Sequence, residues 1–302
     1  MLLDAIIVGG SFAGLSAAMQ LGRARKTVLV IDSGRPRNRF SDASHGFFGR
    51  DGASPVAMIS EAQRQVGAYP SVQFAGGEAV RASREDAAFA VTLGDGTIAR
   101  SRKLVLASGV QDVLPDLPGL RERWGRTVLH CPYCHGYELD QAPLGVLTLG
   151  PLSAHQALLI ADWGPVTLFT DGRDDLDADM RAKLARRLVA IETARVVALE
   201  GELPALAGVR LADGRLVPVV ALFIAAPTRM GSTMPEQLGC AFEDGLVGPM
   251  LVTDATKQTT VAGVYAAGDV ALPGSNVALA VSDGAMAAVH LHRALVAETA
   301  AG

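Results

Sequence analysis

The first 32 residues carry the pattern that most restricts how this chain can fold. Residues 4–8 are a short apolar run with β-branched side chains, and the glycine-rich turn GGSFAG follows at 9–14. Residues 15–21 favour a helix, and residues 28–31 predict a second strand that ends on Asp32. This order is typical of dinucleotide-binding sites: a strand, a glycine turn, a helix, and a second strand that ends on an acid.

Each part of this unit has a function in holding a dinucleotide. The glycines let the backbone approach a pyrophosphate, and the helix N-terminus supplies N–H groups and a favourable dipole. Asp32 stands 23 positions after Gly9 and can accept hydrogen bonds from ribose hydroxyls. The usual middle glycine is Ser11 here, so a tight turn without a ligand is the alternative. The strand–helix–strand context favours the dinucleotide site.

A second unit with weaker glycine signals lies in the middle of the chain. Residues 144–149 predict a strand, and Gly150 follows directly. Residues 153–162 predict a helix, and residues 166–169 predict the next strand. This repeat predicts an α/β fold with two related dinucleotide-binding, Rossmann-like domains.

The remaining segments also predict alternating helices and strands. A helix with a good N-cap and first residue begins at Ser54-Pro55, residues 87–100 predict a hairpin around Gly-Asp-Gly, and residues 103–109 predict a strand. Near the C-terminus, residues 263–269 predict a strand that ends on Gly-Asp, and residues 277–297 predict a helix.

Composition argues against several classes of partner. The chain has 302 residues, of which 49% are hydrophobic and 19% charged, enough for two domains with large cores. A net charge of −4 argues against a nucleic-acid groove or an anionic membrane surface, and the basic cluster at 35–39 is interpreted as a solvated loop. No apolar run approaches the roughly 20 residues of a membrane span. Because the N-terminus has no basic leader, we expect a cytoplasmic protein.

The stretch Cys131-Pro-Tyr-Cys134-His135 is the most informative one for chemistry. Two thiols with two residues between them can close a small disulfide, and in an intracellular chain this favours a redox-active pair. The alternatives are c-type haem attachment, a zinc site that adds His130 and His135, and a pair of inert core thiols. Haem attachment requires export, and four ligands within six residues crowd a zinc tetrahedron, so we expect no metal.

Taken in order, these pieces resemble the low-molecular-weight thioredoxin reductase family over nearly the whole chain. The resemblance is carried by the turn at 9–14, Ala-Ser-Gly at 107–109, the cysteine pair, Ala-Gly-Asp at 267–269 and the last helix. It implies a homodimer whose subunit has an FAD domain built from both ends of the chain, with a degenerate NAD(P)-type domain inserted. The implied FAD domain comprises residues 1–112 and 229–302, and the inserted domain comprises residues 113–228.

The resemblance also assigns residues to the cofactor. The glycine turn would line the FAD pyrophosphate, Asp32 would hold the adenosine ribose, and Asp269 would bind the ribityl–phosphate region. A helix start at 275–277 would lie near the flavin pyrimidine ring, where its dipole stabilises the anionic reduced flavin. The implied cofactor-binding residues are Gly9, Gly10, Ser11, Gly14, Asp32, Asn38, Gly109, Gly268, Asp269, Asn276 and Val277.

The second unit departs from the family pattern for NADPH. Leu149 and Pro151 stand where two further glycines are expected around Gly150. Proline removes an N–H donor close to the expected phosphate, and leucine fills space that a pyrophosphate needs. Asp171 lies where the family carries an arginine pair for the 2′-phosphate, and an acid would repel that group.

The second departure is His135, which follows the second cysteine where the family usually has an aspartate. This looks like the flavin-dependent dithiol oxidases of the gliotoxin and holomycin type, which close disulfides in small sulfur-containing metabolites and pass electrons to oxygen. An imidazole can give or take a proton near neutrality, and a structural histidine that caps the turn is the alternative. By family analogy, Cys134 faces the flavin and Cys131 meets the substrate.

The sequence therefore predicts an FAD-dependent thiol–disulfide oxidoreductase with Cys131, Cys134 and His135 as catalytic residues. We favour oxidation of a small-molecule or peptide dithiol with oxygen as acceptor and without NADPH. The alternatives are an NAD(P)H-dependent reductase that acts on a thioredoxin-like protein, and a non-catalytic flavin–dithiol redox sensor. His45 is an open candidate in the loop after the second strand, and Glu138 either orients His135 or lies exposed.

Overall fold

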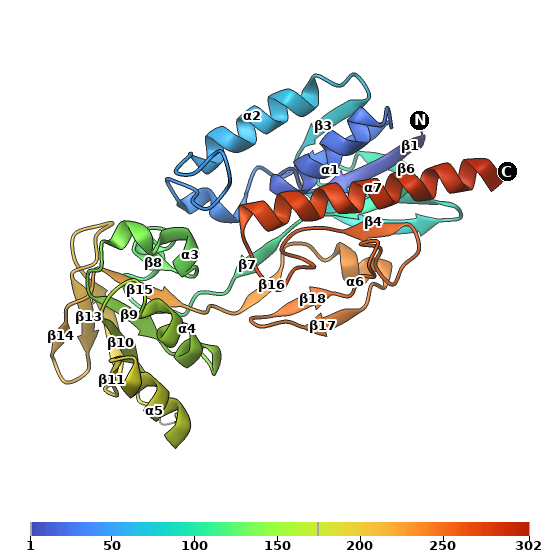
Figure 1. The fold of residues 1–302 in the computed structure, drawn as a ribbon. Helices are drawn as coiled ribbons and strands as arrows, with labels where there is room; N and C mark the ends of the chain where they lie inside the picture. Colours follow the sequence, from blue (N-terminus) through green and yellow to red (C-terminus); the bar gives the residue numbers. More distant parts are fainter. Residues whose placement is uncertain (1, 174, 302) are drawn as a thin grey trace.

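A computed structural model describes residues 2–173 and 175–301 of the chain. Figure 1 shows two α/β parts side by side. The larger part holds both ends of the chain, with β1–β6, α1, α2, α6, α7 and β17–β19. The smaller part holds the middle of the chain, with β8–β15 and α3–α5.

The larger part is built on a mixed sheet in the order β3-β2-β1-β6-β5-β4, and β19 lies beside the end of β6. The neighbours β1, β2, β3, β6 and β19 run parallel, while β4, β5 and β6 form an antiparallel meander. The strands of this sheet are β1 (Leu2–Val8), β2 (Val28–Asp32), β3 (Val72–Gly76), β4 (Ala79–Glu85), β5 (Ala88–Leu93), β6 (Ile98–Leu106) and β19 (Val264–Ala266).

The apolar run at the start of the chain forms the central strand β1 because both faces of that strand are covered. Ala5 and Ile7 pack into the core on one face, and Ile6 and Val8 pack into the core on the other. A strand buried on both faces is continuously apolar, whereas a strand with one face in water alternates apolar and polar residues. The core of the larger part therefore lies on both sides of this sheet.

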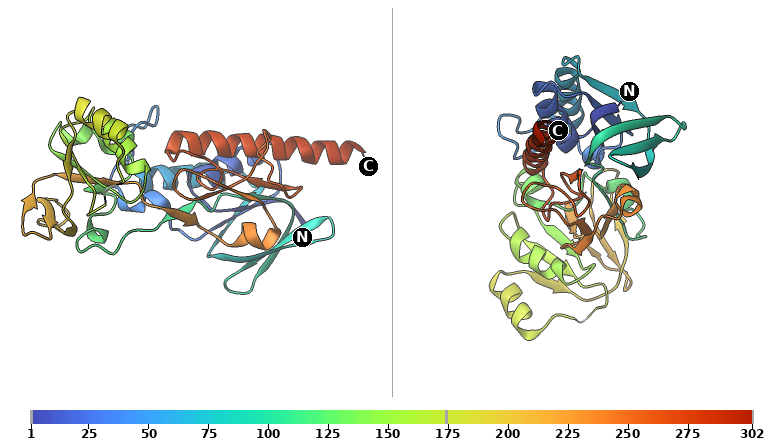
Figure 2. Two further views of the ribbon diagram at one scale, coloured as in Figure 1. Left: turned by 90° about the horizontal axis from the view of Figure 1, so that it is seen from below. Right: turned by 90° about the vertical axis from the view of Figure 1, so that its right-hand side faces the viewer.

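Helices from both ends of the chain cover one face of the sheet. α1 (Phe12–Arg23), α2 (Pro55–Gly67) and α7 (Val277–Ala301) share one hydrophobic core, and α7 runs along α1 (Figures 1 and 2). The helix start at Val277 and the hairpin between β5 and β6 agree with the sequence prediction. The expected cap of α2 is wrong in one detail, because the Ser54 side chain makes no capping hydrogen bond.

The smaller part has a parallel sheet in the order β11-β10-β9-β15-β8 and an antiparallel sheet β12-β13-β14. Its strands are β8 (Val128–Leu129), β9 (Leu144–Leu147), β10 (Val166–Phe169), β11 (Ala190–Glu192), β12 (Val196–Glu200), β13 (Gly208–Leu211), β14 (Leu216–Val217) and β15 (Ala221–Ile224). Its helices are α3 (Pro132–His135), α4 (Leu152–Ile160) and α5 (Ala178–Arg186), and short 3₁₀ turns lie at Arg121–Arg123 and Tyr137–Leu139. With the larger part, this sheet confirms the predicted α/β class with two Rossmann-like units.

Two antiparallel strands, β7 (Val110–Asp112) and β16 (Thr228–Met230), connect the two parts. The predicted domain boundaries at 112 and 228 fall on this pair, and the domain division itself stays a prediction. The chain then forms α6 (Met234–Leu238) and the hairpin of β17 (Phe242–Asp244) and β18 (Pro249–Leu251). Among the described residues, no helix is long and apolar enough to cross a membrane.

Candidate cofactor and redox site

The turn between β1 and α1 is closed so tightly that only glycine fits. A Cβ at Gly14 would lie 1.8 Å from the Gly9 carbonyl oxygen, and a Cβ at Gly9 would lie 2.2 Å from the Ala107 carbonyl oxygen. The close approach brings the N-terminus of α1 to the carboxyl edge of the sheet. The Ser11 side chain makes no capping hydrogen bond there, so the turn fits the pyrophosphate of a dinucleotide.

Asp32 stands at the end of β2, next to this turn. Its Oδ1 accepts a hydrogen bond from the backbone N–H of Gly10 at 3.1 Å, and a Cβ at Gly10 would lie 2.7 Å from the Asp32 Cβ. Asp32 is half-buried, so one side of its carboxylate is held by the turn while the group stays accessible. This placement fits the predicted contact with a ribose.

The C-terminal segment reaches the same edge of the sheet through β19. The backbone N–H of Gly268 donates to Asp283 Oδ2 at 2.9 Å, and the buried Asp283 also pairs with Lys257. Asn276 Oδ1 accepts from the backbone N–H of Leu279 at 2.7 Å, so Asn276 caps α7. Asp283 holds the Gly-Asp turn in place from inside α7, and no local sequence pattern predicted this role.

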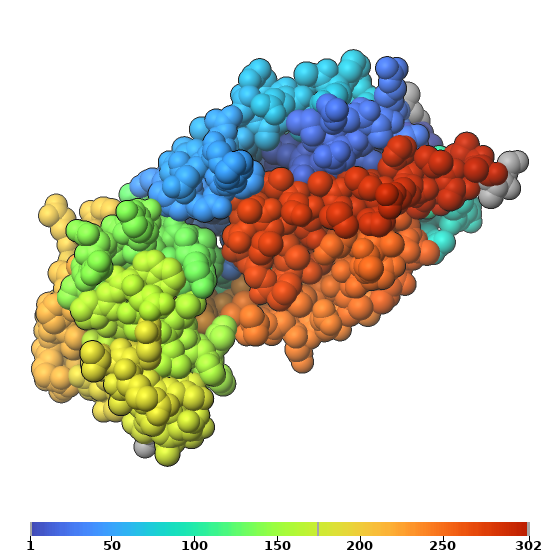
Figure 3. All heavy atoms as spheres, viewed as in Figure 1, coloured from blue at the N-terminus to red at the C-terminus, as the bar shows by residue number. Residues whose placement is uncertain are grey.

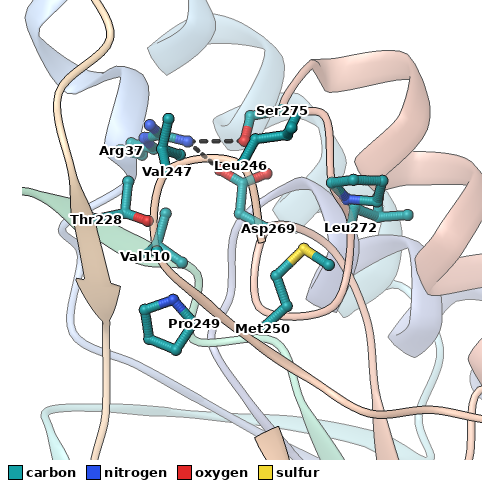
Figure 4. Close-up of a pocket in the computed structure, with 12 residues that line it drawn as sticks. Arg37, Val110, Thr228, Leu246, Val247, Pro249, Met250, Asp269, Leu272 and Ser275 are labelled. Atoms are coloured by element: carbon teal, nitrogen blue, oxygen red, sulfur yellow. Dashed lines mark hydrogen bonds and ion pairs between the residues drawn. The ribbon is translucent and has the colours of Figure 1, made fainter. Parts of the chain in front are cut away.

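Arg37 lies at the centre of a buried ion-pair network that the sequence interpretation missed. Its Nη1 is 2.9 Å from Asp269 Oδ2 and 2.8 Å from Ser275 Oγ (Figure 4). Its Nε is 3.0 Å from Asp112 Oδ2. Burial opposes the charge, but both carboxylates outweigh it and raise the pKa of Arg37. The interpretation of 35–39 as a solvated loop is therefore wrong for Arg37, whose side chain is only 18% exposed.

The other two sequence-predicted cofactor residues lie in loops that border the site. Asn38 follows Arg37 in the 3₁₀ turn Arg37–Phe40 and is half-buried. Gly109 has a positive φ of 64° in the exit from β6, and its carbonyl oxygen accepts from the backbone N–H of Gly231 at 2.9 Å. This contact is between backbone groups only, and it fixes the turn into β7.

Cys131 and Cys134 form a disulfide, with their Cα atoms 5.4 Å apart. Cys131 lies directly before α3, and both cysteines are half-buried. In this bonded state the two sulfurs are joined to each other, which fits the predicted redox-active pair. Among the residues that the structure describes, no group of three or more histidine, cysteine or acidic side chains is arranged to hold a metal.

The segment around the disulfide is held by the smaller part. Gln156 Nε2 on α4 donates to the His130 carbonyl oxygen at 2.8 Å. Tyr133 packs edge-on against Trp163 with ring centroids 5.3 Å apart, and a Cβ at Gly136 would lie 2.7 Å from the same indole. These contacts orient α3 at the carboxyl edge of the parallel sheet, where β8 ends.

Two histidines flank the disulfide, and both are held largely neutral. Burial lowers the pKa of His135, the charge of His45 lowers it further, and Glu138 raises it. Burial and the charge of Arg37 lower the pKa of His130 to about 4. A neutral imidazole at His135 can accept a proton from a thiol, which fits the predicted acid–base role.

His45 is brought to the redox segment from the larger part. Its Nδ1 lies 3.3 Å from Glu138 Oε1 and 3.6 Å from Asp51 Oδ1. Glu138 is partly exposed in the 3₁₀ turn after α3 and faces His45. The sequence left both residues open, because no local pattern shows that positions 45 and 138 meet.

The turn between β9 and α4 differs from the first glycine turn in its backbone donors. The N–H of Leu149 already donates to Ser153 Oγ at 3.1 Å, and Pro151 has no N–H. A Cβ at Gly150 would meet nothing within 4 Å, so this turn is open where the first one is tight. A cavity of about 620 Å³ lies beside the turn, lined by residues 149–152 and 244–249, with His155, Ala225 and Pro227.

Comparisons with known proteins agree with this arrangement. The family model of pyridine nucleotide-disulphide oxidoreductases matches residues 3–293. The chain is 34% identical over 300 residues to thioredoxin reductase tcpT of Claviceps purpurea, which covers 95% of this chain and 92% of that protein. The crystal structure of an oxidoreductase from Agrobacterium tumefaciens has a TM-score of 0.94 at 49% identity and covers 98% of this chain and 99% of that one.

The crystal structure of HlmI is similar in the same way, with a TM-score of 0.94 at 39% identity, covering 99% of this chain and 94% of that one. Matches over nearly the full length, in sequence and in fold, define the family of this chain. The chain therefore belongs to the pyridine nucleotide-disulphide oxidoreductases and is a thioredoxin reductase-like, FAD-binding enzyme.

Proposed function

We propose that this enzyme oxidises a dithiol in a small molecule or peptide to a disulfide, with oxygen as the final acceptor and without NADPH. The observation that carries the proposal is the turn between β9 and α4. In this fold a second nucleotide would need backbone N–H groups at that turn. Leu149 uses its N–H on Ser153, and Pro151 has none to offer.

The charge at the end of β10 supports the same proposal. Asp171 follows that strand with a positive φ of 55°, and its Oδ1 accepts from the backbone N–H of Val196 at 2.8 Å. An ionised carboxylate held at this position repels a ribose 2′-phosphate. The neighbouring Arg173 is exposed and belongs to a loop, so it offers one flexible cation in place of a fixed pair.

The residues of the disulfide segment then perform thiol–disulfide exchange. Neutral His135 takes the proton of a substrate thiol, and the substrate sulfur attacks Cys131. The Cys131–Cys134 bond breaks, and Cys134 keeps the electron pair and takes up a proton. The second substrate thiol gives its proton to His135, which is neutral again, and its sulfur attacks the first substrate sulfur. The Cys131 sulfur leaves with the electron pair and takes that proton, which closes the substrate disulfide and leaves both cysteines as thiols. Two electrons have moved from the substrate to the cysteine pair, and the protons balance.

FAD would be held by the β1–α1 turn, Asp32, Asp269 and the start of α7, and when bound it supplies a two-electron acceptor that restores the disulfide. The capped start of α7 would present its dipole to the negative charge of a reduced cofactor. Arg37 orients Asp269 through an ion pair at 2.9 Å. These residues bind and orient, while the chemistry of exchange stays with the two cysteines and His135.

A second candidate is an NAD(P)H-dependent disulfide reductase that acts on a thioredoxin-like protein. The cavity of about 620 Å³ beside the β9–α4 turn favours it, because that space lies where a nicotinamide nucleotide would enter. Relatives such as thioredoxin reductase tcpT carry the name of that activity. In either case we expect a homodimer, as the sequence resemblance implies.

Anaerobic mixing of the purified protein with NADPH, NADH or dithiothreitol distinguishes the two candidates. We expect dithiothreitol to bleach the flavin absorbance rapidly and both nucleotides to do so only slowly. Readmitting oxygen should restore the absorbance, with oxygen consumed in proportion to the dithiol oxidised. Saturable bleaching by micromolar NADPH at a rate that supports turnover would establish the reductase instead.

A further inference from the structure

We propose that His45 is a positioning residue of the dithiol site, which acts through Glu138 on the imidazole of His135. This inference rests on the proposed function, because it concerns the proton transfers of thiol–disulfide exchange. His45 belongs to the larger part, whereas His135 and Glu138 belong to the smaller part. The site would then be complete only where the two parts meet.

The loop that carries His45 is compact. The backbone N–H of Ser44 donates to the Ala53 carbonyl oxygen at 2.8 Å, and that of Gly52 returns to the Ser44 carbonyl oxygen at 2.9 Å. Asp51 Oδ1 accepts from the backbone N–H of Gly46 at 2.8 Å, directly after His45. The histidine therefore projects from a closed loop rather than from a free end.

The same segment is docked on the smaller part at two further points. Arg126 Nη2 lies 3.2 Å from Asp42 Oδ1, and a Cβ at Gly125 would lie 2.6 Å from the Cβ of Phe40. In Figure 3 the blue segment after β2 lies against the green segment that carries the disulfide. Both contacts lie just before the loop, and they bring His45 to Glu138.

His45 and Glu138 shift the pKa of His135 in opposite directions. The positive charge of His45 disfavours an imidazolium at His135, and the negative charge of Glu138 favours it. Because His45 also pairs with Glu138 at 3.3 Å, it screens part of the carboxylate's effect. Of the other charged groups, Asp51 lies 3.6 Å from His45, while Arg37 and Asp112 act on the neighbouring His130.

This arrangement has a consequence for the exchange step. His135 must be neutral to take the proton of the attacking substrate thiol, and it must hold that proton until the Cys134 sulfur leaves with its electron pair. A carboxylate alone would keep His135 protonated to higher pH and so reduce the fraction of ready base. His45 offsets that carboxylate, so His135 stays available as a base to lower pH than it would beside Glu138 alone.

The test uses His45→Asn, Glu138→Gln and the double variant, all as FAD-loaded protein. The titration of His135 is followed from its ring resonances by nuclear magnetic resonance, and the pH dependence of kcat/KM for dithiothreitol is measured in air. We expect His45→Asn to move the His135 titration and the rising limb to higher pH by about half a pH unit or more, the size of one nearby charge. Glu138→Gln should move both to lower pH, and the double variant should lie between.

His292→Asn serves as the matched control, because it lies in the C-terminal half of α7, away from α3 (Figure 1), and it should leave both curves unchanged. Unchanged His135 titration in His45→Asn and Glu138→Gln, or shifts of both in one direction, would overturn the proposal. A variant that fails to fold would be recognised by its loss of FAD. The other single variant would still show in which direction the His135 titration moves. If the wild type oxidises no dithiol, the proposed function fails, while the resonance titration still tests His45.

Discussion

Replacing Gly14 with alanine should weaken FAD binding through the backbone of the β1–α1 turn alone. A Cβ at Gly14 would lie 1.8 Å from the Gly9 carbonyl oxygen, whereas real Cβ atoms stay at 3.0 Å or more. The turn and the helix must therefore separate by about 1.2 Å. Gly9 cannot yield easily, because its backbone N–H donates to the Ile31 carbonyl oxygen at 2.8 Å and the backbone of Ala107 lies close by.

Overpacking of this kind typically costs about 1–3 kcal/mol. If the cost falls on the FAD-bound conformation, the Kd for FAD rises about 5- to 150-fold. The matched control is Gly150→Ala in the corresponding turn of the smaller part, where an added Cβ meets nothing within 4 Å. That variant should bind FAD as the wild type does.

The assay is a titration of each apoprotein with FAD, followed by quenching of the flavin fluorescence. Thermal unfolding of the apoproteins separates a loss of fold from a loss of binding. A folded Gly14→Ala protein that binds FAD as tightly as the wild type would refute the steric reasoning. Equal weakening in Gly150→Ala would show that the two turns do not differ as the structure indicates.

Three further predictions concern the redox segment. Cys131→Ser and Cys134→Ser should both abolish dithiol turnover, but only Cys131→Ser should show thiolate–flavin charge-transfer absorbance. If that band appeared only in Cys134→Ser, the assigned roles of the two cysteines would be reversed. The control is Cys240→Ser, which removes a buried thiol outside the disulfide. His135→Ala should lower turnover by about 10²–10⁴-fold with FAD retained. It should also remove a pH limb that lies on the acid side of the ordinary histidine range, because burial lowers the pKa of His135; an unchanged pH–rate profile would make His135 structural. The pKa of His130 is lowered to about 4, mainly by burial, so the unfolded chain binds a proton that the folded chain does not, and the free energy of unfolding should fall as the pH drops from about 6.5 towards 4. Denaturant unfolding should show a loss of at most about 3 kcal/mol in that window, and His130→Gln should flatten it.

Local sequence patterns predicted the elements and the glycine turn, because each of those features is determined by residues that are neighbours in the sequence. The turn at 9–14 needs glycines for its own closure, and the acid at Asp32 follows its strand directly. The start of α7 at Val277 follows Asn276, whose side chain caps the helix. The cysteine spacing likewise allowed the disulfide that the structure contains. In all these cases the interacting groups lie on one segment or on adjacent strands of one sheet.

Only the tertiary structure decided which distant groups share a site. Arg37 looked like part of a solvated basic loop, yet it is buried between Asp112 and Asp269. His45 and Glu138 lie far apart in the chain and meet only because the loop after β2 docks on the smaller part. The free energy of such contacts depends on burial and on the distance between charges, and both are set by how the two sheets pack together. Residue type and spacing along the chain do not determine that packing. The disulfide could therefore be predicted from the sequence, whereas the charged groups around it could not.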